Sequence, residues 1–213
     1  MAVEAAFRKS IALDPSYSLG HRFLGIVLSH MARHEEASLA IRHARDLDPL
    51  NATNHALSAQ VAFTARDYSG AVQLAQQAIS IDPEFWIGYR QLAQAYEQLN
   101  RTDLALKALN DAGRFSGGNS KAIGLRGYIY AKQGKTKEAH EVLSTLEAVS
   151  RERYIPPYAT ALVHVGLGHH ELALDWLGRA HDAHDVHWVF PPVDPKWDPL
   201  RADSPISLGA AAL

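Results

Sequence analysis

The apolar residues of this chain fall on one face of short segments with helical spacing, and the pattern returns at a fixed interval. In the first full copy, residues 18–51, Leu24 belongs to one predicted helix and Ile41 to a second. Asp48 and Pro49 then end the second helix, because proline disfavours the α conformation in the residue before it. No segment alternates apolar and polar residues over the length of a strand. The pattern predicts an all-α fold built from helix pairs.

The repeat is clearest at two positions of the second helix, which recur every 34 residues. Nine of these ten positions are alanine, and the tenth is leucine. A small residue where two helices cross lets their backbones approach, whereas a bulky one costs about 1–3 kcal/mol in overpacking. We therefore expect these positions to be helix crossings. They are Ala37, Ala71, Ala105, Ala139 and Ala173, followed by Ala44, Ala78, Ala112, Leu146 and Ala180.

The period predicts a half repeat, five full repeats and a C-terminal segment. Their bounds are 1–17, then 18–51, 52–85, 86–119, 120–153 and 154–187, and finally 188–213. Asp67 is a predicted N-cap for the second helix of the second repeat. Gly117 and Gly118 replace the closing proline of the third repeat, where glycine can end a helix in a left-handed conformation.

The first full copy carries the markers His21, Leu24, Gly25, Leu28, Ala37, Ile41, Ala44 and Pro49. Their spacing resembles the tetratricopeptide repeat (TPR), whose template reads W-x2-L-G-x2-Y…A-x3-F…P. The resemblance covers about residues 1–187 and implies a right-handed superhelical solenoid whose first helices line a concave groove for peptides or proteins. One subset of the family grips C-terminal carboxylates with Lys and Asn on first helices. Arg22 and Ile26 stand at two of those positions here, so we do not expect that specificity.

A narrower resemblance rests on five segments near the C-terminus. They are Pro157–Ala161, Leu167–Gly168, Ala173–Leu177, Val193–Pro195 and Asp198–Asp203. These segments are similar to the C-terminal end of bacterial multidomain TPR proteins, which often carry a DNA-binding, adenylate-cyclase or protein-kinase domain upstream. The resemblance implies that this chain is the TPR part of a larger bacterial regulatory or signalling protein.

Both ends of the repeat array are expected to need a cover, because a terminal repeat exposes an apolar face. At the N-terminus, Val3, Phe7 and Ile11 share one helix face, and we expect this face to contact a second copy of the chain. Residues 188–213 are rich in proline and aromatics and read as a cap, with a peptide-like docking motif as the alternative. The aromatic and leucine side chains of this cap are expected to pack on the second helix of the fifth repeat. They are Trp188, Phe190, Trp197 and Leu200, and Gly209–Leu213 reads as a frayed tail.

The formal net charge of −2 gives no general attraction to nucleic acid or to acidic membranes. The absence of cysteine excludes disulfides, thiolate metal sites and cysteine nucleophiles. No apolar run approaches the ~18 residues of a membrane span. We expect a cytoplasmic protein, or a periplasmic one if a longer protein carries an upstream span.

Catalytic motifs are missing from the sequence. No glycine-rich phosphate loop follows a strand, and no motif surrounds any serine, histidine or aspartate, so we expect no enzyme and no cofactor. His181 and His184 would be neighbours on a continuing helix and are the metal candidates. The alternative is that histidines at a helix end interact favourably with the helix dipole.

The expected groove positions are polar or aromatic where packing alone would favour aliphatic residues. They are Arg22, His30, Gln60, Phe63, Arg90, Gln94, Glu97, Lys121, Tyr128, Lys132 and Tyr158. Four are basic and one is acidic, which favours an extended acidic peptide with an apolar anchor. The alternatives are a solvated face without a ligand, and a structural module that self-associates through the Phe7 face.

Overall fold

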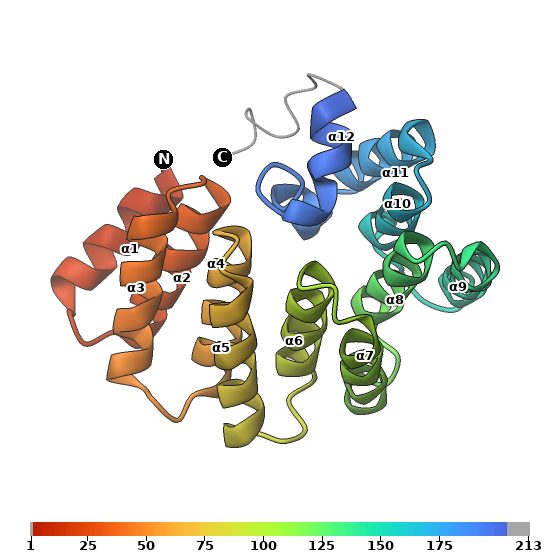
Figure 1. The fold of residues 1–213 in the computed structure, drawn as a ribbon. Coiled ribbons are helices and arrows are strands. Elements are labelled where there is room, and N and C mark those ends of the chain that lie inside the picture. Colours follow the sequence, from red (N-terminus) through yellow and green to blue (C-terminus); the bar gives the residue numbers. More distant parts are fainter. Residues whose placement is uncertain (1, 204–213) are drawn as a thin grey trace. The chain divides into compact units, whose positions relative to one another are not determined.

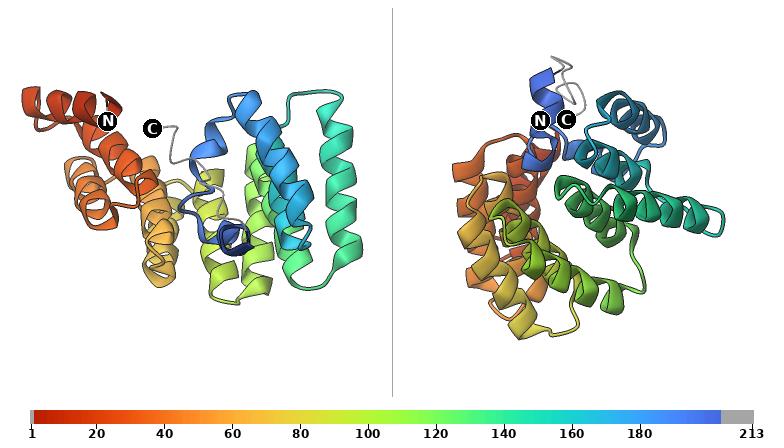
Figure 2. Two further views of the ribbon diagram at one scale, coloured as in Figure 1. Left: turned by 90° about the horizontal axis from the view of Figure 1, so that it is seen from above. Right: turned by 45° about the vertical axis from the view of Figure 1, so that its right-hand side comes forward.

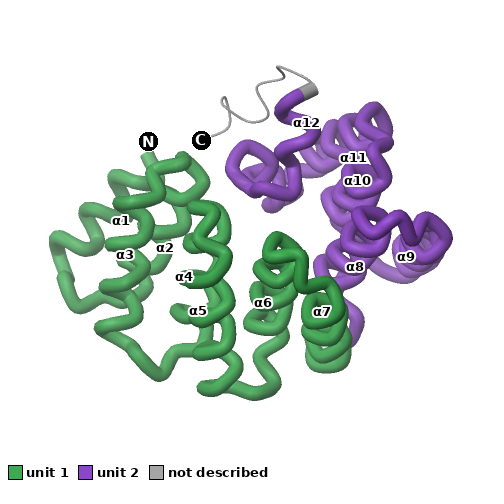
Figure 3. Tube along the Cα trace, in the orientation of Figure 1, with its two compact units in different colours: residues 1–115 green, residues 116–213 purple. Residues whose placement is uncertain are grey.

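The computed structural model describes residues 2–203 (Figure 1). Within this range the regular structure is helical and no strand occurs, so the predicted all-α fold is confirmed. The chain divides into two compact units, residues 1–115 and 116–213 (Figure 3). The tail predicted at Gly209–Leu213 lies outside the described residues.

Unit 1 is a succession of antiparallel helices (Figure 1). They are α1 (Ala2–Leu13), α2 (Ser18–His30), α3 (His34–Leu47), α4 (Ala52–Thr64), α5 (Tyr68–Ile81), α6 (Trp86–Gln98) and α7 (Thr102–Ser116), whose last residue belongs to unit 2. Helix α2 packs on α3, and α4 packs on α5. Helix α4 also contacts α2 and α6, so three predicted first helices lie side by side.

Small residues do mark the helix crossings, as the repeat predicted. All ten recurrent positions are at most 1% exposed. Gly25 on α2 shows how close the helices come, because a Cβ atom there would lie 3.1 Å from the Ala37 carbonyl oxygen and from Ile41 Cβ. Contacts that short leave no room for a larger side chain.

The local signals that start and stop helices are also confirmed. The Asp67 carboxylate accepts a hydrogen bond of 2.8 Å from the Gly70 backbone N–H, which satisfies a free donor at the start of α5. Helices α1, α3 and α5 each end one residue before an Asp-Pro pair. Gly117 and Gly118 adopt φ angles of +64° and +79°, a region that side chains beyond glycine rarely enter.

A recurring hydrogen bond ties each Asp-Pro turn of unit 1 to the first helix that follows it. His21 Nε2 donates to the Pro15 carbonyl oxygen at 3.0 Å, and His55 Nε2 donates to that of Pro49 at 2.8 Å. The Tyr89 hydroxyl donates to the Pro83 carbonyl oxygen at 2.8 Å. The contact therefore follows the 34-residue period although the residue type changes.

Unit 2 contains two further helix pairs, which pack side by side in Figure 2. They are α8 (Ser120–Lys132) with α9 (Thr136–Ser150), and α10 (Pro157–Gly166) with α11 (His170–Asp182). Helix α10 contacts α8, α9 and α11. Gly124 permits the contact between α8 and α10, since a Cβ atom there would lie 2.8 Å from the Ala159 carbonyl oxygen.

The segment after α11 forms two 3₁₀ turns, η1 (Val186–Val189) and η2 (Pro195–Trp197), and the short helix α12 (Asp198–Asp203). The prediction that its aromatic residues pack on α11 is only partly right. Trp188 lies against His181 of α11, with ring centroids 5.1 Å apart. Trp197, which is fully buried, instead donates from Nε1 to the Tyr158 hydroxyl of α10 at 3.1 Å. A buried indole N–H needs an acceptor, and Tyr158 supplies one.

A buried hydrogen bond between His187 and Asp185 reinforces this cap. His187 Nδ1 lies 2.5 Å from Asp185 Oδ1, and both side chains are at most 9% exposed. Burial by itself would raise the pKa of Asp185, but hydrogen bonds from His187 outweigh it and hold the pKa below its usual value. The His187 ring also lies 5.4 Å from that of Tyr158, so the pair fixes η1 on α10.

Helix α1 covers the other end of the described chain less completely. The Phe7 ring stacks on Phe23 at 5.6 Å, and Ile11 packs against the cluster that contains Leu24. Val3 remains 56% exposed, and no described residue of α1 is buried. The Phe7 face is therefore partly used within unit 1, and its contact with a second copy stays a prediction.

Within residues 2–203, no helix is both long enough and apolar enough to cross a membrane.

Candidate functional site

The first-helix face of unit 1 consists of the predicted groove residues on α2, α4 and α6. They are Arg22 and His30, then Gln60 and Phe63, then Arg90, Gln94 and Glu97. Because α4 contacts both of its neighbours, residues 34 positions apart approach each other across this face. The face carries both buried amides and partly buried cations.

Three glutamines form the centre of this face. Gln94 Nε2 donates to Gln60 Oε1 at 3.1 Å and also to Gln91 Oε1. Gln60, Gln91 and Gln94 are only 4%, 1% and 1% exposed. The Nε2 groups of Gln60 and Gln91 have no hydrogen-bond partner in the described part of the chain. Buried donors of this kind are uncommon, because an unmade hydrogen bond costs about 1–3 kcal/mol.

Gln91 was not among the predicted site residues. It is 1% exposed, and its Oε1 accepts a hydrogen bond from Gln94 on the same helix. A sequence signal for it does exist. Gln91 and Gln94 are three residues apart on one predicted helix, and Gln60 lies one period before Gln94.

Arg22 joins α2 to a buried polar junction. Its Nη1 donates to Asn54 Oδ1 at 3.3 Å, while Asn54 Nδ2 donates to the Ala44 carbonyl oxygen at 2.9 Å. Burial lowers the pKa of Arg22, although the guanidinium stays charged at physiological pH. Arg22 Nε is buried and makes no hydrogen bond within residues 2–203. One donor of this cation is thus left for another acceptor.

The remaining side chains on this face set its charge. Arg90 is half-buried, and Glu97 accepts a hydrogen bond from Gln98 Nε2 at 2.7 Å. Burial lowers the pKa of His30 to about 4, so its imidazole is neutral at physiological pH. Phe63 is fully buried and lies 5.7 Å from the Tyr68 ring, where it packs with Ala71 and Ala95.

In unit 2 the predicted groove residues differ in exposure. Lys121 on α8 is half-buried and Lys132 is exposed, whereas Tyr128 is 2% exposed. Tyr158 on α10 is 9% exposed and lies beneath the C-terminal cap, against Trp197. Only the two lysines of this set are accessible.

The metal candidates lie at the end of α11 and in the turn that follows it. His181 is 3.5 Å from Asp182 with both side chains exposed, and His184 stands in the turn after α11 with φ +51°. His140, His164 and His169 also gather, with ring centroids 5.8 Å apart for His164 and His169. Burial, and then the neighbouring His169 and His140, lower the pKa of His164. Among residues 2–203, no three His, Asp or Glu side chains are arranged to hold a metal ion.

Comparison with known proteins identifies the repeat. The sequence profile of the tetratricopeptide repeat matches residues 62–116. No curated protein matches the sequence significantly.

Several solved structures share the fold. TTC0263, a thermophilic TPR protein of Thermus thermophilus, is 20% identical, with a TM-score of 0.64 over 81% of this chain and 94% of its own. PilF of Pseudomonas aeruginosa is 15% identical, with a TM-score of 0.58 over 93% and 87%. YrrB, described as a TPR protein with an unusual peptide-binding site, is 23% identical, with a TM-score of 0.51 over 86% and 95%.

The matched segment contains the end of α4 and all of α5, α6 and α7. The same buried alanines occur at the same spacing on either side of it. Residues 62–116 thus match the tetratricopeptide repeat, and the chain shares the fold of solved tetratricopeptide repeat proteins.

Proposed function

We propose that this chain is a non-catalytic protein–protein interaction module, and that the first-helix face of unit 1 binds an extended acidic peptide or protein segment. The observation that carries the proposal is the glutamine cluster Gln60, Gln91 and Gln94, in which the buried amide donors of Gln60 and Gln91 lack partners among the described residues. Backbone carbonyls of an extended peptide are acceptors of the kind that these donors need.

The charge on the same face favours a peptide that carries carboxylates. Arg22 and Arg90 are cationic and partly buried, and an incompletely solvated cation interacts more strongly with a carboxylate than an exposed one. His30 is neutral and Glu97 is the acidic member, so the face keeps a positive balance. Lys121 and Lys132 give unit 2 a basic surface of its own.

The fold supports the same class of function. YrrB, which shares the fold, is described by its peptide-binding site. We further propose that the chain is the repeat part of a larger bacterial regulatory protein and works in the cytoplasm, or in the periplasm if an upstream span directs it there.

The test is a display library of extended peptides selected on the intact chain, followed by affinity measurement of individual hits. We expect hits rich in Asp and Glu with an aliphatic or aromatic anchor. Arg22→Glu combined with Arg90→Glu should weaken these peptides by at least roughly tenfold at low salt. Each reversal changes a partly buried cation that belongs to the predicted set.

The matched control combines Arg42→Glu with Arg101→Glu, which makes the same charge change at exposed positions of unit 1 outside the set. Loss of binding in both double variants would show that the effect comes from the net charge of the protein and not from these positions. Unchanged binding in the Arg22 and Arg90 variant would show that the peptide binds elsewhere.

A second candidate function is self-association through α1. It is favoured by the exposure of Val3 at 56% and Leu13 at 79%, and by the lack of any buried residue among those described in α1. Sedimentation over a wide concentration range tests it with Val3→Lys, and Leu172→Lys in unit 2 serves as the control. A chain that stays monomeric at high concentration contradicts self-association.

A further inference from the structure

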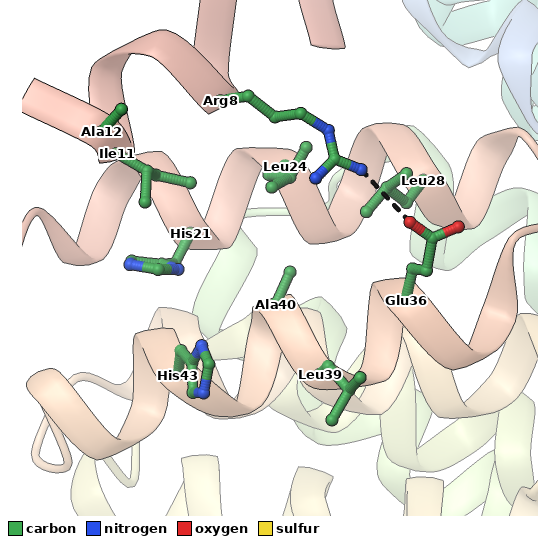
Figure 4. Close-up of a pocket in the computed structure, with 10 residues that line it drawn as sticks. All are labelled: Arg8, Ile11, Ala12, His21, Leu24, Leu28, Glu36, Leu39, Ala40 and His43. Carbon is green, nitrogen blue, oxygen red and sulfur yellow. Dashed lines mark hydrogen bonds and ion pairs between the residues drawn. The ribbon is translucent and has the colours of Figure 1, made fainter. Parts of the chain in front are cut away.

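We propose that unit 1 has a second binding site, a pocket between α1, α2 and α3 that takes a small uncharged aromatic molecule with a hydrogen-bond donor, such as a phenol (Figure 4). The pocket has a volume of about 410 Å³, within the usual range for small-molecule sites. Its apolar lining comes from Ile11 and Ala12, Leu24 and Leu28, and Leu39 and Ala40. These residues belong to another surface than the first-helix face, so the inference is independent of the proposed function.

The repeat itself explains why this space exists. The positions of His21 and Leu28 in α2 correspond, two periods later, to Tyr89 and Tyr96 in α6. Tyr89 packs on Phe115 with ring centroids 5.5 Å apart, and the Tyr96 hydroxyl accepts from Gln76 at 3.4 Å. Repeat three thus fills the equivalent region with two phenol rings, whereas repeat one leaves it to smaller side chains. A small aromatic ligand could therefore occupy the space in repeat one that the tyrosine rings fill in repeat three.

Charge at one end of the pocket favours an uncharged ligand. Arg8 contacts the carboxylate of Glu36 at 3.2 Å and that of Glu4 at 3.0 Å. Arg33 contacts the same two carboxylates, at 2.6 Å and 2.8 Å. Two cations and two anions therefore neutralise one another, and this end has no surplus charge for an ionised ligand to pair with.

The other end of the pocket offers a hydrogen-bond acceptor. His21 Nε2 faces the Pro15 carbonyl oxygen, which can only accept, so Nε2 carries the hydrogen of the neutral ring. The other nitrogen, Nδ1, is then an acceptor, and it makes no hydrogen bond within residues 2–203. The ring of His43 stands edge-on to that of His21 at 5.4 Å and encloses this end. A phenol hydroxyl can donate to Nδ1 while its ring contacts the leucines.

The experiment titrates the intact chain with p-cresol and with toluene and follows the ring protons of His21 and His43 by NMR. We expect saturable binding of p-cresol that is roughly tenfold tighter than that of toluene, because toluene cannot donate a hydrogen bond. Leu28→Tyr places the repeat-three residue in the pocket and should reduce p-cresol binding at least tenfold or so. Leu104→Tyr, at an exposed leucine of α7, is the matched control and should leave binding within about twofold.

Leu28 is buried, so the folding of its variant is checked by thermal melting. His21→Tyr, at a half-buried position, fills the pocket from its rim and serves if Leu28→Tyr unfolds. Absence of saturable p-cresol binding overturns the proposal, as does equal binding by the parent and a folded filling variant. Equal affinity for toluene and p-cresol overturns the role of His21.

Discussion

Helix α4 in unit 1 and helix α10 in unit 2 occupy the same place in their repeats, yet they bury different chemistry. Helix α4 buries Asn54, Gln60 and Thr64, whereas α10 buries Leu162 and Val163. Burying a polar group costs free energy unless its hydrogen bonds are made. Burying an apolar side chain does not depend on hydrogen bonds. The difference indicates that α10 serves mainly for packing, whereas α4 retains polar groups that an efficient core would not keep.

The largest expected effect tests the apolar side of this comparison. Trp197→Ala removes a fully buried ring and its hydrogen bond to Tyr158, and should lower the free energy of unfolding by about 3–5 kcal/mol. Urea denaturation measures it. Trp188→Ala, at a half-buried ring, is the control and should cost less. A change below about 1 kcal/mol for Trp197 would show that the cap does not stabilise unit 2.

The next effect concerns pH and unit 1. The pKa of His30 falls from 6.5 to about 4 on folding, because burial disfavours the charged imidazole. The unfolded chain therefore binds the extra proton between these values. Stability from this group is fully present above pH 6.5 and is lost as the pH falls towards 4, by on the order of 3 kcal/mol.

Urea midpoints at a series of pH values measure that loss. His30→Gln removes the titrating ring, so its stability should vary less between pH 6.5 and 4 than that of the parent. Parallel curves for the two proteins would contradict a buried neutral His30.

A smaller effect separates the structural and recognition roles of the glutamine cluster. Gln94→Ala leaves the acceptors of Gln60 and Gln91 without their donor and should cost about 1–3 kcal/mol. Replacing all three glutamines by leucine removes every amide of the cluster and should be close to neutral for stability. The triple variant should nevertheless lose peptide binding. Retained binding in that variant would show that the amides only pack.

The smallest expected effect on stability comes from removing the buried hydroxyl pair between α2 and α4. Ser29 Oγ lies 2.7 Å from Thr64 Oγ1, and both residues are 2% exposed. Thr64→Val should cost about 1 kcal/mol, whereas Ser29→Ala together with Thr64→Val should cost less than the sum of the single changes. A double-mutant cycle in urea measures the coupling. Strict additivity would mean that the two hydroxyls do not interact.

The sequence was sufficient to predict the helices, their stops and their crossings. Alanine at a fixed spacing, Asp67 at a cap and Gly117 in a left-handed turn each depend on a few neighbouring residues. Such local signals can be interpreted without knowing the rest of the chain.

The site was less predictable, for physical reasons. Helical phase assigns a residue to a face but does not say how closely the neighbouring helix approaches, and so it could not foresee that Gln60 and Gln94 would be buried together. Tyr158 was placed in a groove because the repeat has no information about the non-repeating segment that covers it. Gln91 was missed because its position usually serves packing.

The hydrogen bond from each first helix to the preceding proline carbonyl has a consequence for protein engineering. Nature uses histidine twice and tyrosine once in this role, so the junction selects a ring with an N–H or O–H rather than one residue type. Repeats of this protein could therefore be exchanged or concatenated with His or Tyr at that position. Phenylalanine, which matches their shape but cannot donate, would leave the carbonyl unpaired and loosen the angle at which one module meets the next.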